Sequence, residues 1–309
     1  MNNESNAAAA PATREVRPMV WSVRRELWEN RSIYLAPLFA AGIVLFGFLI
    51  SSVDLTDRMR AAMALEPLKQ HAVITMPFSV AAVVIMLTSV VVGMFYCLDA
   101  LYGERRDRSI LFWKSLPVSD LTTVLSKLII PMAVLPLVAF AVIVATQLIM
   151  LLVSSLILMG SDLSAGMLWT QWTVFHESMV LLYGLATVAL WFAPVYGWLL
   201  LVSGWAQRST LLWAVLPPLA VSAFEKLAFD TTIFWSMLKF RLTGSFSQAF
   251  VVNAGSAPAA KGAPRQMHIP EAIPDPMHFL SSPGLWLGLL AAVALIAAVI
   301  WMRRYRDPI

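Results

Sequence analysis

The chain has 309 residues, of which 59% are apolar and 13% are charged, and its formal net charge is +4. A soluble domain has about 45–50% apolar and about 25% charged residues, so this composition excludes an ordinary soluble domain and indicates an integral membrane protein. The single cysteine, Cys97, has no partner in the chain for a disulfide, and its apolar surroundings predict a small core residue.

The N-terminal segment is expected to be a polar tail followed by a helix. Residues 1–15 lack the apolar stretch of a cleavable signal peptide, so we expect a disordered cytoplasmic tail and a first span that stays in the membrane. From Val16 onward, apolar residues recur at spacings of three and four, with Trp21 and Trp28 beside them. This pattern predicts an amphipathic helix in the head-group plane, and the alternative is a simple extension of the first span. The charged residues of the opposite face are Arg25, Glu26 and Glu29.

Six apolar segments follow, each long enough to cross a hydrocarbon core of about 30 Å as a helix. They cover residues 33–52, 73–98, 128–159, 179–202, 211–229 and 285–302. We therefore expect an all-α fold in which residues 16–309 form one transmembrane domain with six transmembrane helices. The third segment is too long for a straight span, so we expect Pro131 and Pro136 to kink it or part of it to protrude. Pro217 and Pro218 are expected to interrupt the fifth segment.

The distribution of basic residues predicts the orientation. Most of the 22 Lys and Arg residues fall in the N-terminal tail, at the C-terminus and in the loops after the second and fourth segments. Because basic residues are enriched in cytoplasmic loops, both termini are expected in the cytoplasm. The membrane itself is expected to be a bacterial inner membrane. The positive charge is explained by this distribution, so no nucleic acid is expected as a partner.

The loop between the second and third segments reads YGERRDRSILFWKSLPVS, from Tyr102 to Ser119. Its charged run is expected to be solvated by water. A short apolar stretch with Phe112 and Trp113 follows, Pro117 ends it, and Ser119 is suited to begin the next helix as its N-cap. Exposed aromatic residues usually mark interfaces, so this loop either binds a partner or lays its rings against the bilayer.

The order of an interfacial helix, two spans and this loop resembles the permease subunits of type-2 ABC exporters, the ABC-2 membrane protein family. In that family the loop has the form E-R-x-x-x-(T/S), then a hydrophobic residue, six further residues and P-(V/L)-S. The residues that match this form, or lie in its apolar stretch, are Glu104, Arg105, Arg108, Ser109, Ile110, Leu111, Lys114, Ser115, Leu116, Pro117, Val118 and Ser119.

The resemblance implies that residues 109–116 form a cytoplasmic coupling helix that binds a separate ATPase subunit, which holds ATP and Mg²⁺. It also implies a second permease subunit, most simply a second copy of this chain in a homodimer. The substrate is not indicated. The residues implied to contact the ATPase are Glu104, Arg105, Arg108, Ile110, Phe112, Trp113, Lys114, Leu116 and Pro117.

Catalytic and metal sites are not expected in this chain. It has no G-x-x-x-x-G-K-(S/T) motif to hold a nucleotide, so the ATPase site is expected on another polypeptide. His176 and Glu177 are adjacent, but zinc needs three or four ligands in a fixed geometry, which the spacing of the chain's other His and acidic residues does not provide. Two alternatives remain: a membrane module that transmits force from an ATPase without carrying substrate, and an intramembrane enzyme.

Residues 230–282 are expected outside the membrane, in the position of the lid that members of the resembled family often have. The aromatic segment 231–250 predicts one or two interfacial or re-entrant helices, residues 253–266 a flexible linker, and the later prolines an extended path. Glu225, beside Lys226, either lines the outer end of a substrate path or reaches water at the interface.

Overall fold

The computed structural model describes residues 18–107, 119–162, 166–171, 174–253 and 271–305. Six of its helices are long and apolar enough to cross a membrane, and each overlaps one of the six predicted segments. The chain is therefore a multi-pass helical membrane protein, as its composition predicts. The predicted coupling helix, residues 109–116, lies outside the described residues.

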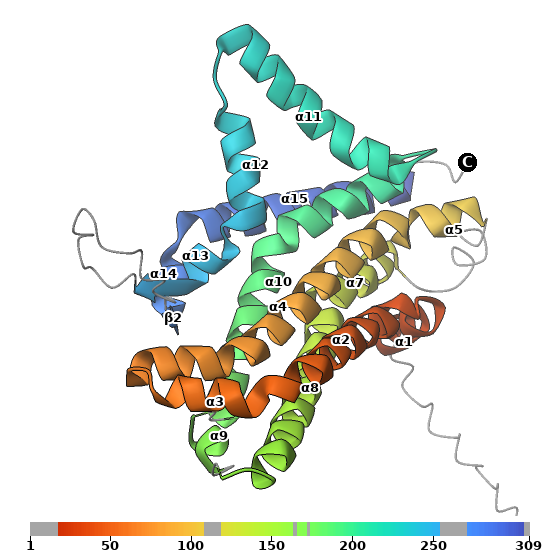
Figure 1. Cartoon of the computed structure of the whole chain (residues 1–309). Coiled ribbons are helices and arrows are strands. Elements are labelled where there is room, and N and C mark those ends of the chain that lie inside the picture. Colours follow the sequence, from red (N-terminus) through yellow and green to blue (C-terminus); the bar gives the residue numbers. More distant parts are fainter. Residues whose placement is uncertain (1–17, 108–118, 163–165, 172–173, 254–270, 306–309) are drawn as a thin grey trace, which may run out of the picture.

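The first third of the chain forms a long helical hairpin with a short helix before it (Figure 1). The apolar residues of the first span continue into a third helix, whose Leu55 and Met59 pack against Ile74 and Phe78 of the second span. Asn30 separates the first two helices, and its side-chain amide donates to the carbonyl of Glu26. The elements are α1 (Pro18–Glu29), α2 (Ser32–Ser51), η1 (Ser52–Asp54), α3 (Leu55–Met63), α4 (Pro67–Ala100) and α5 (Tyr102–Arg106).

The third span begins with α7 (Asp120–Ile129), and the Ser119 side chain caps it by accepting a hydrogen bond from the Thr122 amide. A π-helical turn, η2 (Ile130–Val134), follows, and α8 (Leu135–Met159) completes the span. The irregular turn coincides with Pro131 and Pro136, whose missing N–H groups each remove a helical hydrogen bond. The helix is thus irregular at the prolines where a kink was expected, and it continues through a π-helical turn.

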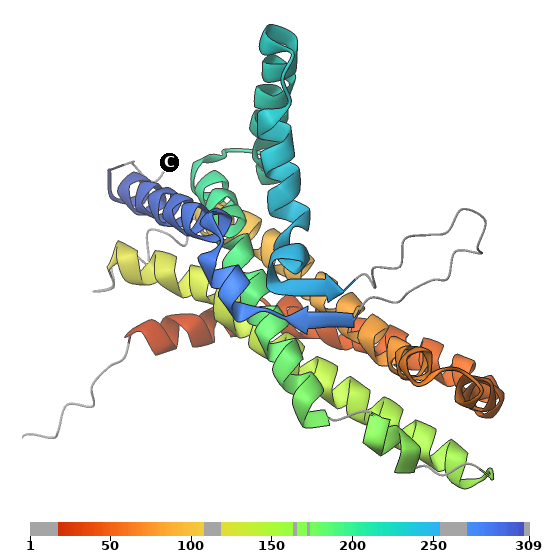
Figure 2. The same ribbon diagram turned by 90° about the vertical axis from the view of Figure 1, so that its left-hand side faces the viewer.

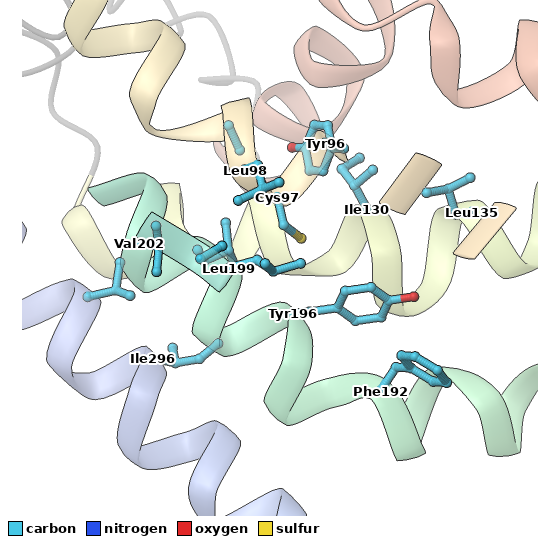
Figure 3. Close-up of a cluster of buried hydrophobic side chains, with 14 of the residues drawn as sticks. Tyr96, Cys97, Leu98, Ile130, Leu135, Phe192, Tyr196, Leu199, Val202 and Ile296 are labelled. Atoms are coloured by element: carbon cyan, nitrogen blue, oxygen red, sulfur yellow. The ribbon is translucent and has the colours of Figure 1, made fainter. Parts of the chain in front are cut away.

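The core lies where α10 (Val174–Trp205) crosses α4 and α15 (Pro283–Tyr305), after the short helix α9 (Gly166–Gln171). Figure 3 shows Cys97 of α4 directed toward Leu199 of α10, while Tyr96 lies on the other side of α4 and donates to Glu26 of α1. Cys97 is fully buried in this cluster, as expected of a small core residue. The core therefore joins spans from both halves of the chain.

The fifth span, α11 (Thr210–Phe229), is one continuous helix, so the expected interruption at Pro217 and Pro218 is wrong. Pro218 has no N–H to donate to the carbonyl of Ala214, four residues earlier. The Trp198 indole N–H of α10 donates to that carbonyl instead, at 3.0 Å. A side chain of α10 thus satisfies the Ala214 carbonyl, which Pro218 leaves without its helical donor. This hydrogen bond lets α11 continue through the two prolines.

The described residues between the fifth and sixth spans form three helices and a small antiparallel sheet, in which Phe250 pairs with Pro274 (Figure 2). Of the one or two helices predicted for residues 231–250, two are present, α12 and α13. The extended path holds for the second strand, but it is wrong at Pro276 and Pro283, which each begin a helix because proline suits the first helical position. The elements are α12 (Ile233–Thr243), α13 (Ser245–Ala249), β1 (Phe250–Asn253), β2 (Glu271–Pro274) and α14 (Pro276–Ser281).

The spans run between two ends of the molecule. One end carries α1, α5 and the C-terminal end of α15, and we call it the terminal end (Figure 1). The other carries α3, α9, α13, α14 and the two strands, and we call it the loop end. The helices α11 and α12 form a V that stands apart from the other spans.

Candidate functional site

Charged side chains from four helices converge at the terminal end, together with one tyrosine from α4. They come from segments that are far apart in the sequence and meet because α1, α4 and α15 all pack against α7. Most of these side chains are shielded from water. We call this group the charged network, and it consists of Arg25, Glu26, Tyr96, Glu104, Asp120, Lys127 and Arg303.

Glu26 and Lys127 form the most deeply buried pair of the charged network, with 1% and 2% of their side chains exposed. The Lys127 ammonium donates to Glu26 Oε1 at 2.8 Å, and the Tyr96 hydroxyl donates to Glu26 Oε2 at 2.8 Å. Arg25 also donates to Glu26 Oε1, at 2.9 Å. Three helices, α1, α4 and α7, are therefore joined at one carboxylate.

Glu104 is the second acceptor of the charged network and pairs with three cations. Its Oε1 lies 3.1 Å from the Lys127 ammonium and 3.3 Å from Arg25, and its Oε2 accepts from Arg303 at 3.0 Å. A buried carboxylate needs such partners, because an unpaired buried charge costs several kcal/mol. Glu104 thus connects the end of the second span to α1, α7 and the last span.

Arg303 contacts both flanks of the loop that follows the second span. Its Nη1 donates to Glu104, which precedes the loop. Its Nε donates to Oδ1 of Asp120, which follows the loop, at 2.9 Å. The planar guanidinium suits this arrangement, because it presents several donors in fixed directions. The two flanks are therefore held by one side chain of α15.

Arg105 lies beside the charged network and binds the end of α10. Its NH2 donates to the carbonyls of Ser203 and Ala206, each at 2.6 Å. In return, the Ser203 hydroxyl accepts from the amides of Leu101 and Tyr102, at 3.0 and 2.9 Å. A cation at a helix C-terminus is favourable, because the last carbonyls have no helical partner.

Electrostatics favour the ionised form of Glu26. Burial by itself raises the pKa of this carboxyl, but the Lys127 charge and the hydrogen bonds from Lys127, Arg25 and Tyr96 outweigh burial and hold the pKa below its ordinary value. Burial also acts on neighbouring Glu29, and there it dominates, so the pKa of Glu29 is raised. Glu26 is thus expected to stay charged at neutral pH.

The structure places the sequence-predicted contact residues in two groups. Glu104 and Arg105 are engaged within the chain, where the resemblance implied contacts with a separate subunit. The expectation that water solvates the charged run is wrong for Glu104, which is 9% exposed, because it packs among three cations of its own chain. The remaining predicted contacts lie outside the described residues: Arg108, Ile110, Phe112, Trp113, Lys114, Leu116 and Pro117.

Glu225 lies at the turn between α11 and α12. Its Oε1 accepts from the Thr231 hydroxyl and the Ile233 amide, both at 2.8 Å, and its Oε2 accepts from the Phe234 amide at 2.9 Å. These amides open α12, where unpaired N–H groups favour a negative charge. Glu225 therefore caps α12 within the chain, and its place in a substrate path stays a prediction.

Sequence reasoning missed most of the charged network. It placed Glu26 on the face of the first helix opposite the apolar stripe, yet Glu26 is buried against Lys127. One signal was available: Lys127 directly precedes the apolar run of the third span, and a charge next to a span needs a partner. The identity of that partner follows only from the packing of α1 against α7.

Comparisons with protein families, with characterised proteins and with solved structures found no match to this chain. The resemblance to the ABC-2 family therefore rests on the loop residues and the order of the elements. Within the described residues, no group of three or more His, Cys, Asp or Glu side chains is arranged to hold a metal ion.

Proposed function

We propose that this chain is the permease subunit of an ATP-driven exporter similar to the ABC-2 family. In this proposal a separate ATPase, which holds ATP and Mg²⁺, acts on the permease through the loop between α5 and α7. The loop motif from Glu104 to Ser119 and the short helix before six spans support this assignment. The orientation follows the basic residues, which put the terminal end in the cytoplasm.

The attachment of the loop at both flanks carries the proposal. Arg303 contacts Glu104 before the loop and Asp120 after it, and Lys127 extends the same network to α1. A force on the loop would therefore reach α1, α4, α7 and α15 together. A loop that merely connects two spans has no need of such attachments, because each buried ion costs several kcal/mol in desolvation.

A second permease copy is part of the proposal, because six spans form half of an exporter of this kind. The fifth span supports it. Ala214 is the one residue of α11 that is buried within the described chain, although the helix carries many large apolar side chains. A second copy or lipid must cover these side chains, since exposed apolar surface of this size is unfavourable in water.

The test is co-purification of the chain with its ATPase. Trp113→Ala is expected to weaken the complex by about 2 kcal/mol, roughly 30-fold, as loss of a buried aromatic anchor does. Arg108→Glu is expected to weaken it as well, because a reversed charge would face the acidic partner proposed for Arg108. The matched controls are Trp301→Ala and Arg106→Glu, which alter exposed residues at the same end.

Full retention of the ATPase by both loop variants would contradict the proposal. Membrane yield is measured in parallel, because neither change touches a span and insertion should be normal. Transport is then followed as efflux of candidate lipids and drugs from vesicles that contain the complex and ATP. Binding and ATP hydrolysis without any efflux would favour the alternative, a module that transmits force without carrying substrate.

A further inference from the structure

The outward face of α1 carries two tryptophans with an arginine between them. The Arg24 guanidinium lies 5.5 Å from the centre of the Trp21 ring and 4.7 Å from that of Trp28. Trp21 and Trp28 are 58% and 65% exposed, and neighbouring Val20 is also exposed. Spacings of three and four place these side chains on one side of the helix. We call Val20, Trp21, Arg24 and Trp28 the Trp–Arg face.

Arg24 differs from the cations of the charged network. Adjacent Arg25 points to the inner side of α1, where it pairs with Glu26 and Glu104. Among the residues that the structure describes, no carboxylate forms an ion pair with Arg24. Its N–H groups are therefore available to an external anion, while the two rings limit where that anion can bind.

The position of α1 fixes what the Trp–Arg face meets. The apolar residues Val23 and Leu27 already pack against the core, so the outward rings have no place inside the chain. The first span begins at Ser32, four residues after Trp28, which puts the face at the edge of the hydrocarbon. Tryptophan is enriched at this depth, where its ring contacts acyl chains and its N–H meets head groups.

We propose that the Trp–Arg face binds the phosphate of an anionic phospholipid. The guanidinium offers paired N–H donors that match phosphate oxygens, and the indole faces hold it by cation–π contact. The exposed rings and Val20 favour a lipid over a soluble acidic partner, because they need an apolar layer beside the charge. This proposal does not depend on the exporter assignment.

The experiment measures the lipids that remain bound to the purified full chain. The chain is delipidated in detergent, incubated with phosphatidylglycerol or phosphatidylcholine, and analysed by native mass spectrometry. The wild type is expected to retain phosphatidylglycerol preferentially. Arg24→Gln is expected to lower that retention about fivefold or more, since one basic residue near an anionic surface contributes about 1 kcal/mol. Trp28→Leu keeps the charge and is expected to lower retention about twofold or more, because a cation–π contact is lost.

Matched variants separate a built site from general surface charge. Arg31→Gln removes the same charge at the junction of α1 and α2, and Trp286→Leu removes an exposed tryptophan at the loop end. Each is expected to have less than half the effect of its counterpart. Equal losses for Arg24→Gln and Arg31→Gln would overturn the proposal, as would unchanged retention in Arg24→Gln. Displacement of the lipid by millimolar inorganic phosphate would show a free-anion site instead and would also overturn it.

Discussion

At the scale of single residues, burial of charge distinguishes the terminal end from an ordinary connection between spans. Lys127 and Glu26 are almost fully buried, yet each has several partners within hydrogen-bonding distance. Such a group is stable only while it is complete, because a charge left without its partner retains the cost of desolvation. The network therefore ties the position of α1 to that of α7 more strictly than apolar packing would.

Lys127→Met tests this dependence. The change leaves Glu26 and Glu104 without their shared cation, so we expect the free energy of unfolding to fall by about 3 kcal/mol or more. The lowered pKa of Glu26 means that its contribution to stability is present above the ordinary carboxyl pKa and is lost as the pH falls through the folded-state value. Without Lys127 that pKa rises, so the variant should lose stability at a higher pH than the wild type.

Thermal unfolding in detergent across acidic pH provides the measurement for Lys127→Met. Lys226→Met is the control, because Lys226 pairs with Asp230 on an exposed surface, where an ion pair contributes within about 1 kcal/mol. A loss in Lys127→Met as small as in this control would mean that the buried pair contributes little.

At the scale of elements, α12 is held against α10 and α15 by one arginine. The Arg241 guanidinium lies 4.5 Å from the Trp191 ring and donates to the carbonyl of Gly284, while the Trp191 indole donates to the carbonyl of Arg241. Gly288 makes room for it, because a Cβ at that position would overlap the Arg241 guanidinium. The V formed by α11 and α12 is thus attached to the bundle through a glycine in the last span.

Gly288→Ala tests this attachment. Alanine normally stabilises a helix by about 1 kcal/mol relative to glycine. Helix preference alone would therefore make the Gly288→Ala chain more stable, so a loss of stability must come from the contact with Arg241. We expect a loss of about 1–3 kcal/mol, because the methyl group displaces the Arg241 guanidinium. The measurement is thermal unfolding, together with proteolysis of the segment between α11 and α12.

Two further variants make the Gly288 result specific. Gly42→Ala places a methyl group where no atom beyond the adjoining backbone of its own helix lies within 4 Å, so it should be neutral or stabilising. Arg241→Ala combined with Gly288→Ala should recover the part of the loss that is due to the clash, since the two residues are in direct contact. A Gly288→Ala chain as stable as Gly42→Ala would refute the attachment.

At the scale of the whole molecule, six spans place α1 and the C-terminal end of α15 at the same end, and the charged network lies there too. The basic residues predict that this end faces the cytoplasm. Arg208 is exposed at the end of the fourth span, and Lys239 is exposed on α12 between the fifth and sixth spans. These two positions are therefore expected on opposite sides of the membrane.

Single-cysteine labelling checks this orientation. In intact cells, a membrane-impermeant thiol reagent is expected to label Lys239→Cys, and to label Arg208→Cys only after the membrane is opened. Native Cys97 is fully buried and should give no background in the folded chain. Labelling of both positions from the same side would rule out the six-span topology.

The number and order of the spans could be predicted from the sequence because each helix must satisfy its own backbone in lipid. An apolar run of about 20 residues meets that requirement locally, without reference to the rest of the chain. The Ser119 cap and the irregular helical turn near Pro131 also depend on neighbouring residues alone, and both are present in the structure. The loop motif carries the proposed function in the same way, since its residues are consecutive.

The partners of charged and irregular groups were decided by the tertiary structure. Glu26, Glu104 and Arg303 are separated by many residues, so no local pattern indicates that they meet at Lys127 and Asp120. Pro218 shows the same dependence, because α11 continues only where Trp198 of another span reaches the carbonyl of Ala214. Ion pairs and hydrogen bonds act over a few ångströms in space, and it is the packing of the spans that brings these groups within that distance.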